Sequence, residues 1–93
     1  MLLPPKKGKR LDTENFQRVS SRAARSIDFA ARARTIEIEF INGDVYQYYK
    51  APRWLWESIL EIIGSGGSLG TFLNQDFKAE VKHLDIDYRR ILS

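Results

Sequence analysis

Two alternating apolar runs on either side of an Asn-Gly pair, within residues 35–50, restrict the fold of this chain more than any other feature. Asn-Gly between such runs is the strongest short-range signal for a β-hairpin, because both residues readily adopt the positive φ that tight hairpin turns require. Strand side chains alternate between two faces. The apolar set is Ile36, Ile38 and Phe40, and the opposite set is Glu37 and Glu39. We therefore expect one face of the hairpin to be core and the other to be solvated.

The length of the turn decides on which face Tyr46 and Tyr48 lie, since a shift of one residue moves every side chain of the second strand to the opposite face. With a two-residue Asn-Gly turn, Phe40 faces Val45, and both tyrosines stand with the carboxylates. With a three-residue loop whose glycine is left-handed, Phe40 faces Asp44, and both tyrosines join the isoleucines. We favour the three-residue loop because it puts two large rings over the apolar face, although it leaves Val45 outside.

Composition places the chain among small globular proteins. Its 93 residues suffice for one domain with one modest core. A hydrophobic content of 43% and a charged content of 29% are ordinary for such a domain. The absence of cysteine excludes disulfides and thiolate chemistry. The apolar part of residues 1–7 is too short for a signal peptide, and no run reaches transmembrane length, so we expect a cytoplasmic protein without a membrane partner.

Positive charge is concentrated in the first third of the chain. Residues 1–34 hold nine Lys and Arg against three Asp and Glu, a net charge of +6, and the remainder carries −3. A basic segment can attract polyanions through phosphate contacts and counterion release. The alternative is that these side chains only solvate a loop-rich surface, and the charge pattern does not separate the two interpretations.

The segment before the hairpin is less well defined. Residues 1–15 contain two prolines, a glycine and four basic residues but almost nothing apolar to bury, so we expect a flexible basic arm. Residues 16–19 can form a short strand. Over residues 21–34, the alanines and arginines favour a helix by propensity. The alternative is a turn, a strand over residues 25–29 and a basic loop that leads into the hairpin.

A helix is predicted to start at Pro52, because proline suits the first helical turn, where its missing N–H has no partner to lose. The apolar residues that follow fall on one stripe, and Gly64 can supply a left-handed stop. The stripe consists of Leu55, Trp56, Ile59, Leu60 and Ile63. Trp54 and Ile62 lie beside it, where they either pack in the core, which we prefer, or offer an apolar contact surface.

A second amphipathic helix is predicted over residues 69–84 from apolar residues at helical spacing. These are Leu69, Phe72, Leu73, Phe77, Val81 and Leu84. The glycines of residues 65–68 can expose N–H groups to an anion, but the loop does not match the Walker pattern, so we expect a connector. The apolar residues of the C-terminal tail, residues 85–93, indicate that it packs back in part.

The search for catalytic chemistry is negative. His83 is the single histidine and cysteine is absent, so a histidine-rich metal cage or a Cys/His pair is impossible. Glu37 and Glu39 resemble an acid/base pair, but neighbouring carboxylates on a strand usually form a solvated face. We therefore expect a non-catalytic protein without metal or cofactor, with His83 partly exposed.

Several of these elements occur in a distinctive order. The order is Ser20-Ser21, Ser26-Ile27-Asp28-Phe29, residues 35–40 with Asn42-Gly43, Tyr46-Gln47-Tyr48, Ala51-Pro52, Leu60, and Gly67 to Asn74. It resembles the KTSC domain, a small module named for the C-terminus of some lysyl-tRNA synthetases and also found as a stand-alone bacterial protein. The central Tyr-x-Tyr is its most distinctive mark. The family usually continues Ser-Ser with Asn-Ile, whereas this chain has Arg22-Ala23, but the resemblance favours the strand over residues 25–29.

We therefore expect an α+β domain over residues 16–84, in which a small antiparallel meander of about three strands packs against two helices. The KTSC family has no established activity, and its synthetase context suggests RNA binding. Under that hypothesis, basic residues contact phosphates while aromatic side chains stack on bases. The candidate residues are Arg22, Arg25, Arg32, Arg34, Tyr46, Tyr48, Lys50 and Arg53.

The alternative hypothesis is a protein-interaction module. Its partner would cover Trp54, Ile62 or an open edge of the sheet, since a three-stranded sheet leaves its edges available for strand addition. The two hypotheses differ in the charge beside the aromatic side chains that escape the core. A neighbouring arginine favours RNA, whereas Glu37 or Glu39 would repel phosphate.

Overall fold

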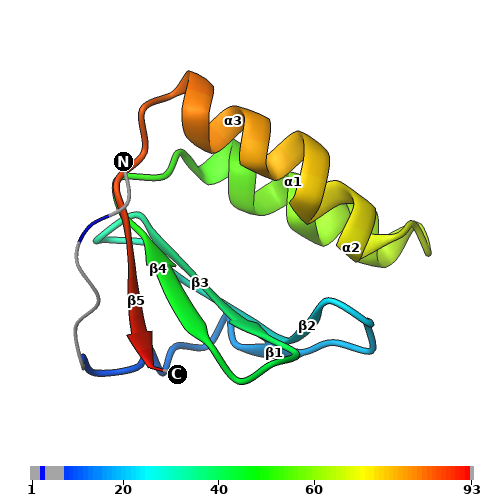
Figure 1. The fold of residues 1–93 in the computed structure, drawn as a ribbon, viewed down its shortest axis with the longest axis horizontal. Coiled ribbons are helices and arrows are strands. Elements are labelled where there is room, and N and C mark those ends of the chain that lie inside the picture. The colour runs from blue at the N-terminus through cyan, green and yellow to red at the C-terminus, as the bar shows by residue number, and fades with distance from the viewer. Residues whose placement is uncertain (1–2, 4–7, 93) are drawn as a thin grey trace.

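The computed structural model describes residue 3 and residues 8–92. Five strands in this part of the chain form one antiparallel sheet in the order β1-β2-β3-β4-β5, and the helices cover one of its faces (Figure 1). The elements are β1 (Gln17–Arg18), β2 (Ala24–Ala30), β3 (Thr35–Phe40), β4 (Val45–Tyr48), α1 (Arg53–Gly64), α2 (Leu69–Phe72), η1 (Leu73–Phe77), α3 (Lys78–His83) and β5 (Tyr88–Leu92). The expected α+β class is confirmed, with β1 and β5 added on either side of the predicted meander.

The β3–β4 turn is the three-residue loop. The Phe40 N–H donates to the backbone carbonyl oxygen of Asp44 at 2.8 Å, and Gly43 has a φ of 95°. The register sets Ile38 opposite Tyr46 and Ile36 opposite Tyr48. Both tyrosines therefore lie on the face that the helices cover.

Residues 24–30 form a strand, against the helix that propensity favours. Along β2, Ile27 pairs with Ile38, and Phe29 pairs with Ile36. All four side chains are buried beneath the helices. This tertiary pairing outweighs the modest helix preference of the alanines and arginines, because propensity is a weak prior that burial overrides.

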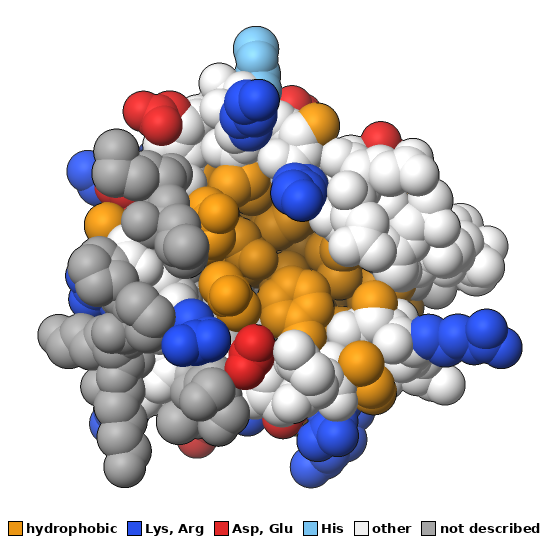
Figure 2. Space-filling model, viewed as in Figure 1, with side chains coloured by type: hydrophobic (Ala, Val, Ile, Leu, Met, Phe, Trp, Pro, Cys, Tyr) orange, Lys and Arg blue, Asp and Glu red, His pale blue; other side chains and the backbone are white. Residues whose placement is uncertain are grey.

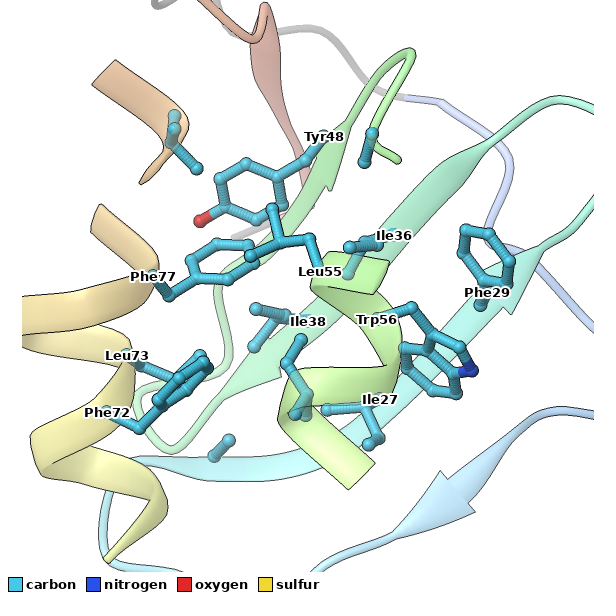
Figure 3. Packing of buried hydrophobic residues seen from close by; sticks show 14 of the residues in the cluster. Ile27, Phe29, Ile36, Ile38, Tyr48, Leu55, Trp56, Phe72, Leu73 and Phe77 are labelled. Carbon is cyan, nitrogen blue, oxygen red and sulfur yellow. The ribbon is translucent and has the colours of Figure 1, made fainter. Parts of the chain in front are cut away.

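Helix α1 packs its predicted stripe on the sheet. Trp56 stacks on Phe29 with ring centroids 5.5 Å apart (Figure 3). Leu55 and Ile59 are buried in the same core. The expected left-handed stop at Gly64 is wrong, because Gly64 is the last residue of the helix. The left-handed glycine is Gly66, with a φ of 76°.

The second predicted helix is confirmed as α2, η1 and α3, which follow one another without a break. The Ser68 hydroxyl accepts from the Thr71 N–H at 3.2 Å and caps the first turn. Residues 73–77 form one turn of π-helix, a wider turn that is rare and often lies at functional sites.

The other face of the sheet is not solvated as expected. Residues 8–15, which we call the N-terminal strap, lie on the side of the sheet away from the helices (Figure 1). Beneath the strap Glu37 is only 1% exposed. Its carboxylate accepts from the Arg10 guanidinium, the Leu11 N–H and the Gln47 amide, at 2.9 to 3.4 Å. These donors explain how a carboxylate can be buried.

The strap binds a second carboxylate in the same way. Asp28, directly opposite Glu37 on β2, accepts from the N–H and the hydroxyl of Thr13. Val45, expected outside, is 1% exposed on this face. Of the arm expected over residues 1–15, residues 8–15 are thus bound to the sheet, and residues 1, 2 and 4–7 lie outside the described residues. The tail expected to pack in part forms β5, the fifth strand.

Candidate functional site

Four of the basic residues expected to contact phosphate gather at one end of the sheet. Arg32 and Arg34 lie in the β2–β3 turn, Lys50 follows β4, and Arg53 starts α1. The Ala51 N–H donates to the Arg34 oxygen at 2.7 Å, which joins the β4–α1 connection to this turn. All four side chains are exposed, and none is in an ion pair with another described residue. We call these four residues the basic end.

Two residues of the basic end have an unusual backbone. Arg34 has a φ of 50° and Lys50 a φ of 55°, in the left-handed region that favours glycine. Such a conformation costs about 1 kcal/mol or more, and it is often found at functional sites, where the surrounding structure holds it. The fold thus holds two cations in backbone conformations that glycine would adopt more easily.

An exposed aromatic ring adjoins the basic end. The preferred core packing of Trp54 is wrong: the side chain is 46% exposed in the first turn of α1, next to Arg53. The Arg53 guanidinium lies 5.6 Å from the centroid of the Phe29 ring, which places it against the α1–sheet junction. Glu37 and Glu39 point to the opposite face of the sheet, where both accept hydrogen bonds. The exposed ring therefore lies beside Arg53 and away from Glu37 and Glu39, with Glu57 one turn further along α1.

The remaining predicted site residues do not join the basic end. Arg22 and Arg25 are exposed near the opposite end of the sheet, where the Ile41 N–H donates to the Ala23 oxygen. Tyr46 and Tyr48 lie on the helix-covered face. Ile62 packs against the core and is only partly buried.

Tyr48 lines a second feature, a hollow between η1–α3 and β4–β5 that we call the aromatic groove, and Tyr46 packs behind it. Its volume is about 510 Å³. Figure 2 shows hydrophobic side chains gathered in a hollow between the helices and the sheet, with Lys or Arg side chains at its margin. The apolar lining includes Phe40, Tyr48, Phe77, Val81 and Tyr88.

The rings of the aromatic groove are in mutual contact. Tyr48 meets Phe77 edge to face at 4.9 Å and stacks on Tyr88 at 5.4 Å. Tyr46 stacks on Tyr48 at 6.3 Å and meets Phe40 edge to face at 5.7 Å. These separations are those of favourable aromatic pairs, so the rings form a preformed wall.

Other kinds of site find no support in the described residues. No group of three or more His, Asp or Glu side chains in this part of the chain could hold a metal ion. Within the same residues, no helix has both the length and the apolar character needed to cross a membrane. His83, expected to be partly exposed, is exposed at the end of α3.

Comparison with known families decides which family the chain represents. A family model described as the KTSC domain matches residues 20–81, two thirds of the chain. The chain belongs to the KTSC domain family. A search of curated proteins finds no match.

The KTSC match begins just before β2 and ends within α3. It includes the basic end and Trp54, together with Tyr48 and Phe77 of the aromatic groove. The strap, β1 and β5 lie outside it. In this chain, segments outside the KTSC match therefore cover the carboxylate face and supply Tyr88 to the groove.

Sequence reasoning missed the aromatic groove. The helical spacing predicts Phe77 and Val81 on the apolar side of the helix, and both are buried in the core, while Lys78 and Lys82 are exposed. The signal that could have indicated a groove is that lysines four residues apart adjoin this apolar stripe. The gap between α3 and β5 depends on tertiary packing, and no local pattern encodes it.

Proposed function

We propose that this KTSC domain is a small non-catalytic module that binds RNA through the basic end and Trp54. The observation that carries the proposal is the exposed Trp54 ring beside Arg53, at the end of the sheet that also holds Arg32, Arg34 and Lys50. None of the four cations is in an ion pair with a residue that the structure describes, and Arg34 and Lys50 have positive φ. Single-strand binders combine cations that contact phosphates with exposed rings on which bases stack. The RNA association that the KTSC name suggests agrees with this arrangement.

The alternative, a protein-interaction module, has less support. Of Trp54 and Ile62, only Trp54 is an exposed large apolar side chain. The expected open edges of the sheet are limited. Strand β1 has only two residues. On β5, the backbone carbonyl oxygens of Tyr88 and Ile91 accept from the backbone N–H groups of Leu3 and Gly8. Short or covered edges offer little to an added strand.

The test is a fluorescence titration of a labelled single-stranded oligouridine at two salt concentrations. We expect Arg34→Gly with Lys50→Gly to lower the affinity and to reduce the slope of log affinity against log salt by about 1.4, since each single-strand phosphate contact contributes about 0.7. Because both residues have positive φ, glycine should not destabilise the fold. Loss of binding can then be assigned to the lost cations.

The control for this titration removes two cations from elsewhere. Arg22→Ala with Arg25→Ala changes the net charge equally but acts near the opposite end of the sheet. It should weaken binding much less than the glycine pair. Equal loss in both variants would mean non-specific attraction to the whole protein, and no binding at low salt by the intact protein would refute the proposal.

Trp54 provides a test that is independent of charge. Trp54→Ala should weaken the binding free energy by about 1 to 3 kcal/mol, the usual contribution of a base stacked on an aromatic ring. The salt slope should not change, because no phosphate contact is lost. If Trp54→Ala binds oligouridine as the unmodified protein does, stacking on this ring has no part in the function.

A further inference from the structure

The Tyr48 hydroxyl is the most unusual polar group of the aromatic groove. Tyr48 is 7% exposed, so more than nine tenths of the residue is buried. Among the described residues, its hydroxyl donates no hydrogen bond to another side chain or to the backbone. Figure 3 shows the ring beside Phe77, with the hydroxyl directed toward the side of η1 and α3. The hydroxyl is not sealed from solvent, so a polar atom of a molecule in the groove can reach it and replace a bound water.

The surroundings of this hydroxyl keep it protonated. Burial raises the pKa of the Tyr48 phenol, and the neighbouring Tyr46 and Tyr88 phenols raise it further. The group therefore stays protonated at neutral pH and can donate a hydrogen bond. A donor at the side of an apolar hollow is the kind of polar group that fixes the orientation of a small ligand.

The rim of the aromatic groove is mostly cationic. Lys78 and Lys82 line it one helical turn apart on α3, and both are exposed. Neither is in an ion pair with a residue that the structure describes. The acid in the lining is Asp85, which has a φ of 53°. Two cations against one carboxylate favour an anion at the mouth.

The size and the walls of the groove indicate the size and shape of a molecule that would fit it. A volume of about 510 Å³ lies within the usual range for small-molecule sites, about 300 to 1,000 Å³. The walls are flat rings, which favour a flat ring between them. The single turn of π-helix places Phe77 at this wall, at a position where such turns often serve a binding site.

From these observations we infer that the aromatic groove binds a small planar aromatic molecule that carries an anionic group. Its ring lies against Phe77 and Tyr88, the Tyr48 hydroxyl donates to a polar atom of the ligand, and Lys78 and Lys82 attract the anion. None of these residues belongs to the basic end. The inference is therefore independent of RNA binding, and each can fail alone.

The test is an NMR titration of the amide and aromatic resonances with three probes of one shape and different charge. These are naphthoate, the neutral naphthylmethanol and the cationic naphthylmethylammonium. We expect naphthoate to shift the resonances of Phe77, Val81 and Tyr88 saturably and to bind most tightly, and the ammonium probe to bind most weakly. Equal binding of all three, or no saturable shift with millimolar naphthoate, would overturn the proposal.

Substitutions assign the roles of the polar groups. Tyr48→Phe removes only the hydroxyl and should weaken naphthoate binding about five-fold, whereas Tyr49→Phe, outside the groove, should not. Lys78→Gln with Lys82→Gln should weaken it to a similar extent and remove the preference over naphthylmethanol. Asp85→Asn should strengthen it about two-fold while keeping a side chain that tolerates positive φ. Unchanged affinity in the Tyr48 and lysine variants would refute the assigned roles.

Two other occupants of the groove would each overturn the inference. A second copy of the chain would give groove resonances that depend on protein concentration without any probe, and a dimer in sedimentation. A base of an RNA strand would give groove shifts with oligouridine but none with naphthoate. Thermal unfolding of every variant checks that lost binding does not reflect lost structure.

Discussion

The buried carboxylate of Glu37 accepts hydrogen bonds from donors on separate segments of the chain. Arg10 and the Leu11 N–H reach it from the strap, and Gln47 reaches it from β4. A carboxylate that is buried and fully bonded contributes little net free energy, but removing it leaves its partners without an acceptor. The stability of the fold should therefore be sensitive to any substitution of Glu37.

We expect Glu37→Ala to lower the free energy of unfolding by about 3 kcal/mol, because the Leu11 N–H loses its acceptor and the Arg10 guanidinium loses its buried carboxylate. Urea unfolding followed by circular dichroism measures this change. Glu57→Ala, on the exposed face of α1, is the matched control and should change the free energy by less than about 0.5 kcal/mol. Similar small effects in both variants would mean that the strap does not cover Glu37 in solution.

The Tyr48 phenol should make stability depend on high pH. Burial, with the nearby Tyr46 and Tyr88, raises its folded-state pKa above the unfolded value of about 10. Stability is therefore complete below pH 10 and falls as the pH rises beyond it, by up to about 1.4 kcal/mol per pH unit. Urea unfolding between pH 9 and pH 11 measures the fall. Tyr48→Phe should flatten this pH dependence, and an equally steep fall in that variant would contradict it.

At the scale of elements, the β3–β4 hairpin shows what local sequence can predict. Its loop length and register followed from an Asn-Gly pair and from the benefit of covering Ile36 and Ile38 with rings. The strand β2 could not be predicted from propensity, because its burial depends on β3 and α1. A family resemblance, which carries tertiary information, was needed there.

The hairpin loop itself is testable. Gly43→Val should destabilise the protein by about 2 kcal/mol, since a β-branched residue is strained at a φ of 95°. Gly64→Ala is the control: Gly64 lies within α1 with nothing near its missing Cβ, so alanine should be neutral or stabilising. Thermal midpoints of the two variants should therefore move apart, and a neutral Gly43→Val would contradict the three-residue loop.

At the scale of the whole molecule, the sheet lies between a helix layer and the strap. Sequence reasoning predicted the helix layer, because amphipathic periodicity is local. It did not predict the strap, because Thr13 and Arg10 are ordinary polar residues whose partners, Asp28 and Glu37, lie far along the chain. The aromatic groove was missed for the same reason: Tyr88 reaches it only through the pairing of β5 with β4.

Removing residues 1–15 should therefore destabilise the domain substantially. The shortened chain exposes Asp28 and Glu37 opposite each other without the donors of the strap, and like charges in directly opposed strand positions repel. We expect a thermal midpoint lower by 10 °C or more, about the effect of losing 2 to 3 kcal/mol in a domain of this size. Circular dichroism measures it. An unchanged midpoint would show that residues 8–15 are bound too weakly to matter.

The pairing of β5 with β4 also bears on how the chain folds. Strands β2, β3 and β4 are joined by short turns, whereas β5 must close a loop that contains the described helices, so we expect the β4–β5 pairing to form last. Tyr88 thus completes the aromatic groove only when this late pairing is made. If that order holds, a molecule bound in the groove should slow unfolding and leave the folding rate nearly unchanged, because its contacts form after the transition state.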